Sequence, residues 1–419
     1  MGVIVLNFIA YTIWFCIAYK QENKLTAYSS MILMNVGIAF CSIIILNNGI
    51  YEADFGKVDR EHLASIPYLL CFICYLMLFA PLRKLRFLDV GQYDIFRSTK
   101  LKVITKVLIV AYLIYLVIRI IEIQQGLEMG LAEVYVLRHQ EGVVVFEHSF
   151  FIELFVSFMS TIDVIATPAL IFYAIVGQKK KVISTIKAIF IIMICFLPNI
   201  VSSIAKGSRG GIFLNVICIL FFVVIFYKRM SSQLKRSFFQ VIIGMLVLGT
   251  FYAWLITIAR NEGSGRDPLE GIYRYFGEPF LNLGHLFWGH VKAHPNGARL
   301  FDRIYNQFPS DWTRSDIYMY WWDYTGVPNY NFKTIFGDFY IEYGWLEAII
   351  IIAAIGWLFK YVLSRYQMNF ATLPIAYFYF QICVFSFAGF TKHDMGFIYQ
   401  LLFIYIYVKL LPKLVQKKY

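Results

Sequence analysis

Eleven apolar stretches of about twenty residues constrain this chain more than any other feature of its sequence. A helix needs roughly 20 apolar residues to cross the hydrocarbon core, because lipid offers no partner for unpaired backbone groups. The stretches lie near residues 2–19, 28–46, 63–81, 103–121, 148–177, 188–205, 211–227, 238–258, 336–359, 370–389 and 396–411. We therefore predict a polytopic membrane protein with about eleven helices, the first of which is a retained helix rather than a cleaved signal peptide.

The amino-acid composition is also typical of an integral membrane protein. Of its 419 residues, 59% are hydrophobic and 15% are charged, whereas soluble domains carry about 25% charged residues. The net charge of +12 comes from basic clusters between apolar stretches, which indicates membrane topology rather than nucleic-acid binding. All seven cysteines, including the Cys71-x-x-Cys74 pair, lie inside apolar stretches, so we expect no disulfide, and packing explains the pair better than a metal or redox role.

Basic residues also predict the orientation. One set of alternate connections holds 23 Lys and Arg residues, and the other holds 14. The positive-inside rule therefore predicts a cytoplasmic C-terminus and an outer N-terminus. On the outer side lies a connection of 77 residues, 259–335, which divides the chain into helices 1–8 (1–258), this large loop, and helices 9–11 (336–419).

The large loop is rich in aromatic residues, and such a segment is expected to fold, as short helices on the outer leaflet. Trp312, Trp321 and Trp322 lie close to Asp316 and Asp323. Aromatic faces beside carboxylates suit sugars, whose C–H faces stack on rings while their hydroxyls bond to carboxylates. An interfacial aromatic belt is the alternative.

Cations gather on the predicted outer side. Lys206 and Arg209 flank a glycine turn between the sixth and seventh helices, and Arg260, Arg266 and Arg274 follow the eighth. Glycine lets backbone N–H groups approach an anion, and arginine binds phosphate through two parallel hydrogen bonds. These residues could together hold a diphosphate. Otherwise they are cations that anchor lipid headgroups.

Other polar residues are weaker candidates. His290-x-x-x-His294 lacks the adjacent glutamate of a metalloprotease motif, so we predict no metal site. Arg119 and Glu122 are spaced to pair on one helix face, and Asp163 stands within an apolar stretch, where a carboxylate is a functional hypothesis or a partner for backbone freed by a nearby proline.

The chain resembles the oligosaccharide repeat-unit polymerases of bacterial surface polysaccharide assembly, the Wzy-type or O-antigen polymerases. Three segments carry the likeness: the Gly207-Ser208-Arg209-Gly210 turn, the Tyr-Phe-Gly-Glu-Pro segment at 275–279, and the Phe-Gly-Asp-Phe-Tyr-Ile-Glu-Tyr-Gly segment at 336–344. The layout of about eleven helices with one large late outer loop is also similar, so the likeness spans most of the chain.

This resemblance implies an all-α, GT-C-like membrane bundle in the bacterial inner membrane with its active site facing the periplasm. It implies undecaprenyl-diphosphate-linked repeat units as substrates, no cofactor, and a chain-length regulator and a flippase as candidate partners. Arg209 and Arg260, helped by Lys206, would stabilise the leaving diphosphate in place of a metal. The candidate general bases are Glu278, Asp338, Glu342 and His285. The candidate substrate-binding residues are Lys206, Arg266, Arg274, Tyr275, Tyr340, Trp312, Trp321 and Trp322.

Rival functions share part of this pattern. An O-antigen ligase uses the same donor with a lipid A core acceptor, which the sequence does not distinguish. A lipid-linked oligosaccharide flippase would bury charges along its helices and lack a folded outer loop, and a non-catalytic scaffold would need no cation cluster.

Overall fold

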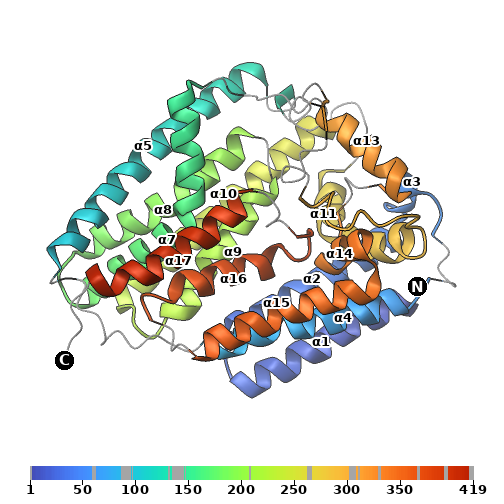
Figure 1. The fold of residues 1–419 in the computed structure, drawn as a ribbon, viewed down its shortest axis with the longest axis horizontal. Coiled ribbons are helices and arrows are strands. Elements are labelled where there is room, and N and C mark those ends of the chain that lie inside the picture. The colour runs from blue at the N-terminus through green and yellow to red at the C-terminus, as the bar shows by residue number, and fades with distance from the viewer. Residues whose placement is uncertain are drawn as a thin grey trace. The chain divides into compact units, whose positions relative to one another are not determined.

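The computed structural model is helical throughout the part of the chain that it describes. These residues are 2–58, 63–85, 96, 98–130, 133–134, 146, 148–206, 209–261, 267–301, 308–309, 312–328, 332–365, 369–390 and 395–414, and they contain no β-strand. They divide into two compact units that are interleaved along the sequence (Figure 1). Unit 1 comprises Met1–Lys84, Asn261–Val362 and Ile382–Asp394, and unit 2 comprises Leu85–Arg260, Leu363–Gln381 and Met395–Tyr419.

Eight helices within the described residues are long and apolar enough to cross a membrane: Gly2–Glu22, Ala27–Asn47, Ile66–Arg83, Thr99–Met129, Phe150–Lys179, Thr185–Ala205, Ser232–Ile258 and Trp345–Ser364. Three shorter apolar helices, Asn215–Phe226, Leu373–Phe385 and Gly396–Leu411, coincide with the remaining predicted stretches. The structure thus supports a polytopic membrane protein, and the count of eleven stays a prediction.

The expectation of one helix over 336–359 is wrong, because Gly344 divides this stretch. The segment forms α14 (Ile335–Tyr343) and then α15 (Trp345–Arg365). Gly344 has φ +98°, a left-handed value that glycine adopts without steric cost. Thr334 begins α14 by accepting a hydrogen bond from the Gly337 amide at 3.0 Å. Helix α14 is therefore a separate short element, outside the candidate membrane spans.

Unit 1 contains the first helices of the chain, most of the predicted large loop, and the two helices that follow this loop. Its elements are α1 (Gly2–Glu22), α2 (Ala27–Asn47), α3 (Glu52–Phe55), α4 (Ile66–Phe79), the 3₁₀ turn η1 (Ala80–Lys84), α11 (Pro268–Asn282), the π-helical turn η4 (Leu283–Phe287), α13 (Arg314–Thr325), α14 and α15. Helix α15 runs alongside α4 (Figure 1), where a Cβ on Gly356 would lie 2.6 Å from the Met77 carbonyl oxygen.

The described residues of the predicted 259–335 loop contain helices, as its composition predicted, and the first of them is α11. Asp267 caps α11 by accepting from the Leu269 amide at 2.8 Å. The helix crosses α2 so closely that a Cβ on Gly277 would lie 2.7 Å from the Cys41 carbonyl carbon, and Ser42 Oγ donates to the Gly277 carbonyl at 2.7 Å. Phe280 stacks on Tyr11 of α1 at 5.6 Å between ring centroids. The first helix of the loop is thus part of the unit 1 core.

Unit 2 is a helical bundle of its own. Its elements are α5 (Thr99–Met129), α7 (Phe150–Lys179), α8 (Thr185–Ala205), α9 (Arg209–Phe226), α10 (Ser232–Asn261), most of α16 (Leu373–Phe385) and α17 (Met395–Leu414). Helix α8 packs against α5, α7 and α9. Large apolar side chains such as Phe172, Phe196 and Phe222 fill the space between the helices and are buried.

Candidate functional site

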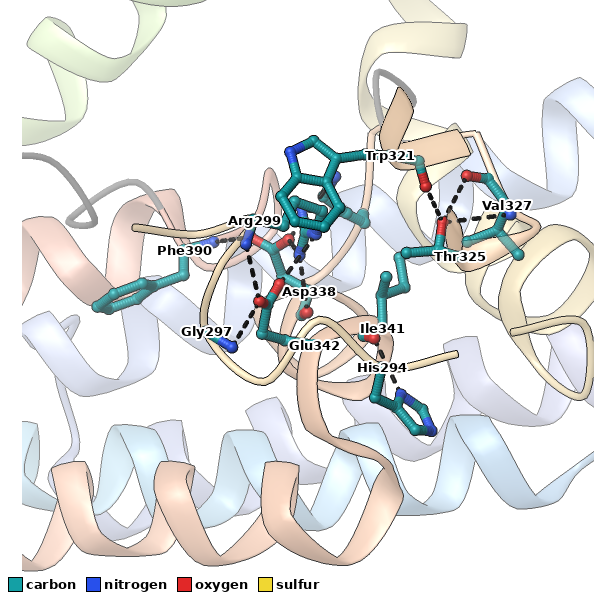
Figure 2. Close-up of polar contacts among 11 residues, drawn as sticks. His294, Gly297, Arg299, Trp321, Thr325, Val327, Asp338, Ile341, Glu342 and Phe390 are labelled. Atoms are coloured by element: carbon teal, nitrogen blue, oxygen red, sulfur yellow. Dashed lines mark hydrogen bonds and ion pairs between the residues drawn. The ribbon is translucent and has the colours of Figure 1, made fainter. Parts of the chain in front are cut away.

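Two carboxylates of α14 meet an arginine inside unit 1. Asp338 and Glu342 are four residues apart and share one face of the helix. Arg299 Nη2 donates to Asp338 Oδ1 at 2.7 Å and to the Asp338 carbonyl at 3.1 Å. Its Nε lies 3.0 Å from Glu342 Oε2, a contact held by charge without hydrogen-bond alignment. The side chains are only 8%, 5% and 0% exposed, so Arg299 bridges both carboxylates in the interior (Figure 2).

Backbone amides complete the surroundings of these carboxylates. Glu342 Oε1 accepts from the amides of Gly297 at 2.7 Å and Arg299 at 3.2 Å. Asp338 Oδ2 accepts from the Phe390 amide at 2.8 Å. A Cβ on the preceding Gly389 would lie 2.9 Å from that same oxygen. The network therefore joins α14 to two segments that are distant in sequence, one near residue 298 and one near residue 390.

Lys333 is the second cation of this buried network. Its Nζ lies 3.6 Å from Asp338 Oδ1, and its side chain is 10% exposed. The pKa of Lys333 is lowered to about 8, because burial and, to a smaller extent, the charge of Arg299 outweigh the attraction of Asp338. Lysine is then mostly protonated at pH 7. Two cations and two carboxylates therefore balance within the network, which is the arrangement that makes buried charges tolerable.

The two carboxylates have opposite pKa shifts. Burial tends to raise the pKa of Asp338, but Lys333 and Arg299 together outweigh it and hold the pKa below its usual value. Burial raises the pKa of Glu342 above its usual value, although Arg299 opposes this. Both were predicted as candidate bases, and the structure brings them together. Because their oxygens already have buried partners, the geometry favours a role in positioning the surrounding segments.

A second ion pair lies on α11. Arg274 Nε donates to Glu278 Oε1 at 2.7 Å, with side chains 24% and 7% exposed. The Arg274 guanidinium also lies 6.0 Å from the centroid of the Phe55 ring. This pair keeps a predicted substrate-binding cation beside a predicted base. It is more open than the Arg299 network, because Arg274 retains access to solvent.

The remaining predicted residues of unit 1 outside α13 are packed among aromatic rings. Tyr275 contacts the rings of Phe276, Phe332 and Phe387 at centroid distances of 5.2, 4.7 and 6.3 Å. Tyr340 is 8% exposed and stacks on Trp288 at 5.0 Å, and its hydroxyl accepts from the Gly289 amide at 3.1 Å. His285 lies 3.4 Å from the Phe55 carbonyl oxygen. Tyr340 is thus positioned as a core residue, whereas Tyr275 and His285 are partly exposed.

The three predicted tryptophans of the α13 region differ in exposure. Trp312 is 37% exposed, Trp322 is half-buried and Trp321 is only 3% exposed. Trp321 contacts the rings of Tyr320 and Phe308 at 5.0 and 5.7 Å between centroids. A sugar can therefore reach Trp312 directly, and the buried Trp321 supports the neighbouring rings from beneath.

Three of the five predicted anion-binding cations belong to unit 2, whereas Arg274 belongs to unit 1. Lys206 follows the last residue of α8, Arg209 is the first residue of α9, and Arg260 is the penultimate residue of α10. Gly207, Ser208 and Arg266 lie outside the described residues, as do the side chains of Arg209 and Arg260.

Contacts between these helices bring their relevant ends together. Tyr252 Oη of α10 donates to the Ile204 carbonyl of α8 at 2.6 Å. A Cβ on Gly249 of α10 would lie 2.7 Å from Ile212 Cγ2 of α9, and a Cβ on Gly126 of α5 would lie 3.0 Å from the Ala205 carbonyl oxygen. The end of α8, the start of α9 and the C-terminal part of α10 therefore meet at one end of unit 2.

Contacts in unit 2 bear on two predictions from the sequence, the Arg119–Glu122 pair and the partners of Asp163. The predicted pair is confirmed, because Arg119 Nη1 donates to both Glu122 oxygens at 2.6 and 2.7 Å. His148 Nε2 also lies 3.0 Å from Glu122 Oε1, which links the end of α5 to the start of α7. Asp163 accepts from the hydroxyls of Tyr112 and Thr167, each at 2.6 Å, so side chains of α5 and α7 are among its partners.

Sequence reasoning missed Arg299 and Lys333, the two cations of the buried network. Arg299 lies 39 residues before Asp338 in the chain. Neither position shows a periodic or spaced pattern that would have selected it. The sequence around Lys333 is apolar and aromatic, and a lone basic residue in such a context was the only local indication of its role.

Comparison with protein-family models, with curated proteins and with solved structures gave no match. Within the described ranges, no three His, Cys, Asp or Glu side chains are grouped closely enough to hold a metal ion. The function is therefore argued from the residues themselves.

Proposed function

We propose that the protein polymerises oligosaccharide repeat units that are linked to undecaprenyl diphosphate, at the periplasmic face of the bacterial inner membrane. The likeness of the 207–210, 275–279 and 336–344 segments to repeat-unit polymerases suggests this activity. The proposal also draws on the polytopic helical architecture, the cations of unit 2 and the folded, aromatic-rich loop of unit 1.

The observation that carries the proposal is the meeting of α8, α9 and α10 at one end of unit 2. It brings the end of α8 at Ile204 and the start of α9 at Ile212 to the C-terminal part of α10. Arg260 lies eight residues, about 12 Å, beyond Tyr252 along α10. Helix α9 is 18 residues long and begins with Arg209-Gly-Gly. The N-terminus of such a helix offers free N–H groups and a partial positive charge to an anion. Cations beside it suit a diphosphate.

The reaction breaks the bond between the first sugar of the donor chain and its diphosphate oxygen. A hydroxyl of the acceptor unit forms the new glycosidic bond and gives its proton to a base. The lipid diphosphate leaves with the bonding electrons, and its growing negative charge needs stabilisation, which Arg209, Arg260 and Lys206 supply without a metal.

Four candidates remain for the general base: Glu278, His285, Asp338 and Glu342. Glu278 and His285 are favoured over Asp338 and Glu342, because the latter two are enclosed by Arg299, Lys333 and backbone amides. Glu278 also carries an arginine partner, which would stabilise its charged form. A base must reach the acceptor hydroxyl within about 3 Å.

The test is the surface glycan profile of cells that carry Arg209→Ala, compared with Arg209→Lys. We expect the alanine variant to lose long chains while single-repeat glycans remain. Lysine should rescue only part of the activity, because a point charge cannot form two parallel hydrogen bonds with phosphate. Arg236→Ala is the matched control, since Arg236 is an exposed arginine near the opposite end of α10, about 36 Å from Arg260 along the helix.

The outcomes separate the candidate functions. Normal long chains in Arg209→Ala cells, with the protein inserted at its usual level, would remove Arg209 from the site and the proposal with it. Complete absence of lipid A-linked glycan, single repeats included, would indicate the ligase function instead. Accumulation of repeat units on the cytoplasmic side would indicate a flippase.

A further inference from the structure

An exposed stripe of aromatic and acidic side chains follows α13. It consists of Trp312, Asp316, Tyr320, Asp323 and Tyr324. The last four share one side of α13, because the other three each lie three or four residues from Tyr320. Trp312 precedes the helix and joins the stripe through its ring contact with Tyr320. The three rings are 37%, 40% and 44% exposed, and both carboxylates are exposed. Within α13 the stripe runs from Asp316 to Tyr324, which is eight residues or roughly 12 Å along the helix axis.

The rings of the stripe are held in place by one another. Trp312 stacks on Phe308 at a centroid distance of 5.3 Å and contacts Tyr320 at 5.9 Å. Tyr320 and Tyr324 lie 6.3 Å apart with an angle of 17° between their planes. The buried Trp321 packs against both tyrosines, at 5.0 and 5.8 Å. Rings that are already ordered lose little conformational entropy when a ligand stacks on them.

The chemistry of the stripe fits a glycan better than a membrane surface. Pyranose rings present C–H faces to aromatic rings, and their hydroxyls donate hydrogen bonds to carboxylates. A helix that lies in the membrane interface instead carries Lys and Arg on its polar side. Helix α13 contains two aspartates and a single basic residue, Arg314. Anionic headgroups would be repelled by Asp316 and Asp323.

We infer that this α13 stripe holds successive sugars of the growing polymer. This inference rests on the proposed polymerase function and adds a site to it. The stripe has aromatic faces and carboxylates but no cation among its five residues, so it suits a neutral or amino-sugar glycan rather than the diphosphate. A platform of this length binds long chains better than single repeat units and favours their retention between transfers.

The experiment uses the full-length protein in nanodiscs and titration calorimetry. The probes are fragments of one and of three repeat units, released by mild acid from the surface polysaccharide of the producing strain. We expect the longer fragment to bind at least tenfold more tightly. Tyr320→Ala with Tyr324→Ala should remove this tenfold difference, because it removes two of the three exposed rings on which the sugars would stack. Tyr320→Phe with Tyr324→Phe keeps the rings and should keep the difference.

Met319→Ala is the matched control, because Met319 is 50% exposed on α13 but has no ring. In cells, the double alanine variant should shorten the glycan chains while the first transfer continues. Equal binding of both fragments by the native protein would overturn the inference, and so would strong quenching of Trp312 fluorescence by brominated lipid, which indicates an interfacial helix. If Arg209→Ala leaves chains normal while length-dependent binding persists, the polymerase proposal fails and the glycan platform stands.

Discussion

Arg299 is the residue on which the unit 1 network depends most. It is 8% exposed and contacts both carboxylates of α14 while its own backbone amide binds Glu342. A buried ion pair adds little net stability over an apolar replacement of both partners, but removal of one partner leaves an uncompensated charge. Arg299 is therefore expected to determine whether α14 and the segment near residue 298 keep their arrangement.

Arg299→Met should lower the free energy of unfolding by about 3 kcal/mol or more, because it leaves one cation against two buried carboxylates. Thermal unfolding of the purified protein in detergent measures this loss. The exposed Lys57→Ala is the control for removal of a cation from unit 1, and it should change the stability by less than about 0.5 kcal/mol.

A compensating variant tests the charge balance directly. Arg299→Met with Glu342→Gln restores one cation to one carboxylate and should recover part of the loss. The single variant should also be less impaired at low pH. Glu342 has a raised pKa in the folded protein, so between its unfolded and folded pKa values the folded state takes up a proton first, and stability rises as the pH falls. The proposed charge balance would be contradicted if Arg299→Met lost the same free energy of unfolding with and without Glu342→Gln, and at neutral and low pH.

At the scale of elements, the docking of α11 on α2 turns the start of the predicted loop into core structure. The contact depends on the absence of a side chain at Gly277, where a Cβ would lie 2.7–2.8 Å from the backbone of Cys41 and Ser42. Backbone atoms cannot move aside as a flexible side chain can. The Ser42 hydroxyl then fixes the crossing point through its hydrogen bond to the Gly277 carbonyl.

Gly277→Ala should therefore destabilise the protein by about 1–3 kcal/mol, because it forces α11 away from α2. Gly37→Ala on α2 is the matched control, since a Cβ there would meet nothing within 4 Å. It should be neutral or stabilising by up to about 1 kcal/mol, because alanine favours the helix. Thermal unfolding of both variants decides the point. Equal melting temperatures for the two would show that the close crossing does not matter.

Sequence patterns predicted the long apolar helices well, because a twenty-residue apolar stretch has few alternatives in lipid. They failed at Gly344, since hydropathy over 336–359 stays high across a break that a single left-handed glycine creates. They also identified Asp338 and Glu342 as notable but could not find their partner. The contact from Arg299 spans 39 residues, and only the folding of the loop brings it to α14.

At the scale of the whole molecule, the proposed function depends on which side of the membrane each connection faces. The orientation is argued from the distribution of Lys and Arg between alternate connections. It assigns the turn at 206–211 to the outer side and the start of α10 at Ser232 to the inner side. The proposed role of Arg209 and Arg260 as diphosphate ligands requires this orientation, because the proposed reaction joins lipid-linked repeat units outside the cytoplasm.

The most direct measurement is labelling of single introduced cysteines with a membrane-impermeant maleimide, with the unaltered protein as background. Ser208→Cys should react in intact spheroplasts, whereas Ser232→Cys, at an exposed position on α10, should react only after the membrane is permeabilised. The reverse pattern, with Ser208→Cys protected until permeabilisation, would place the glycine turn in the cytoplasm and contradict the proposed site.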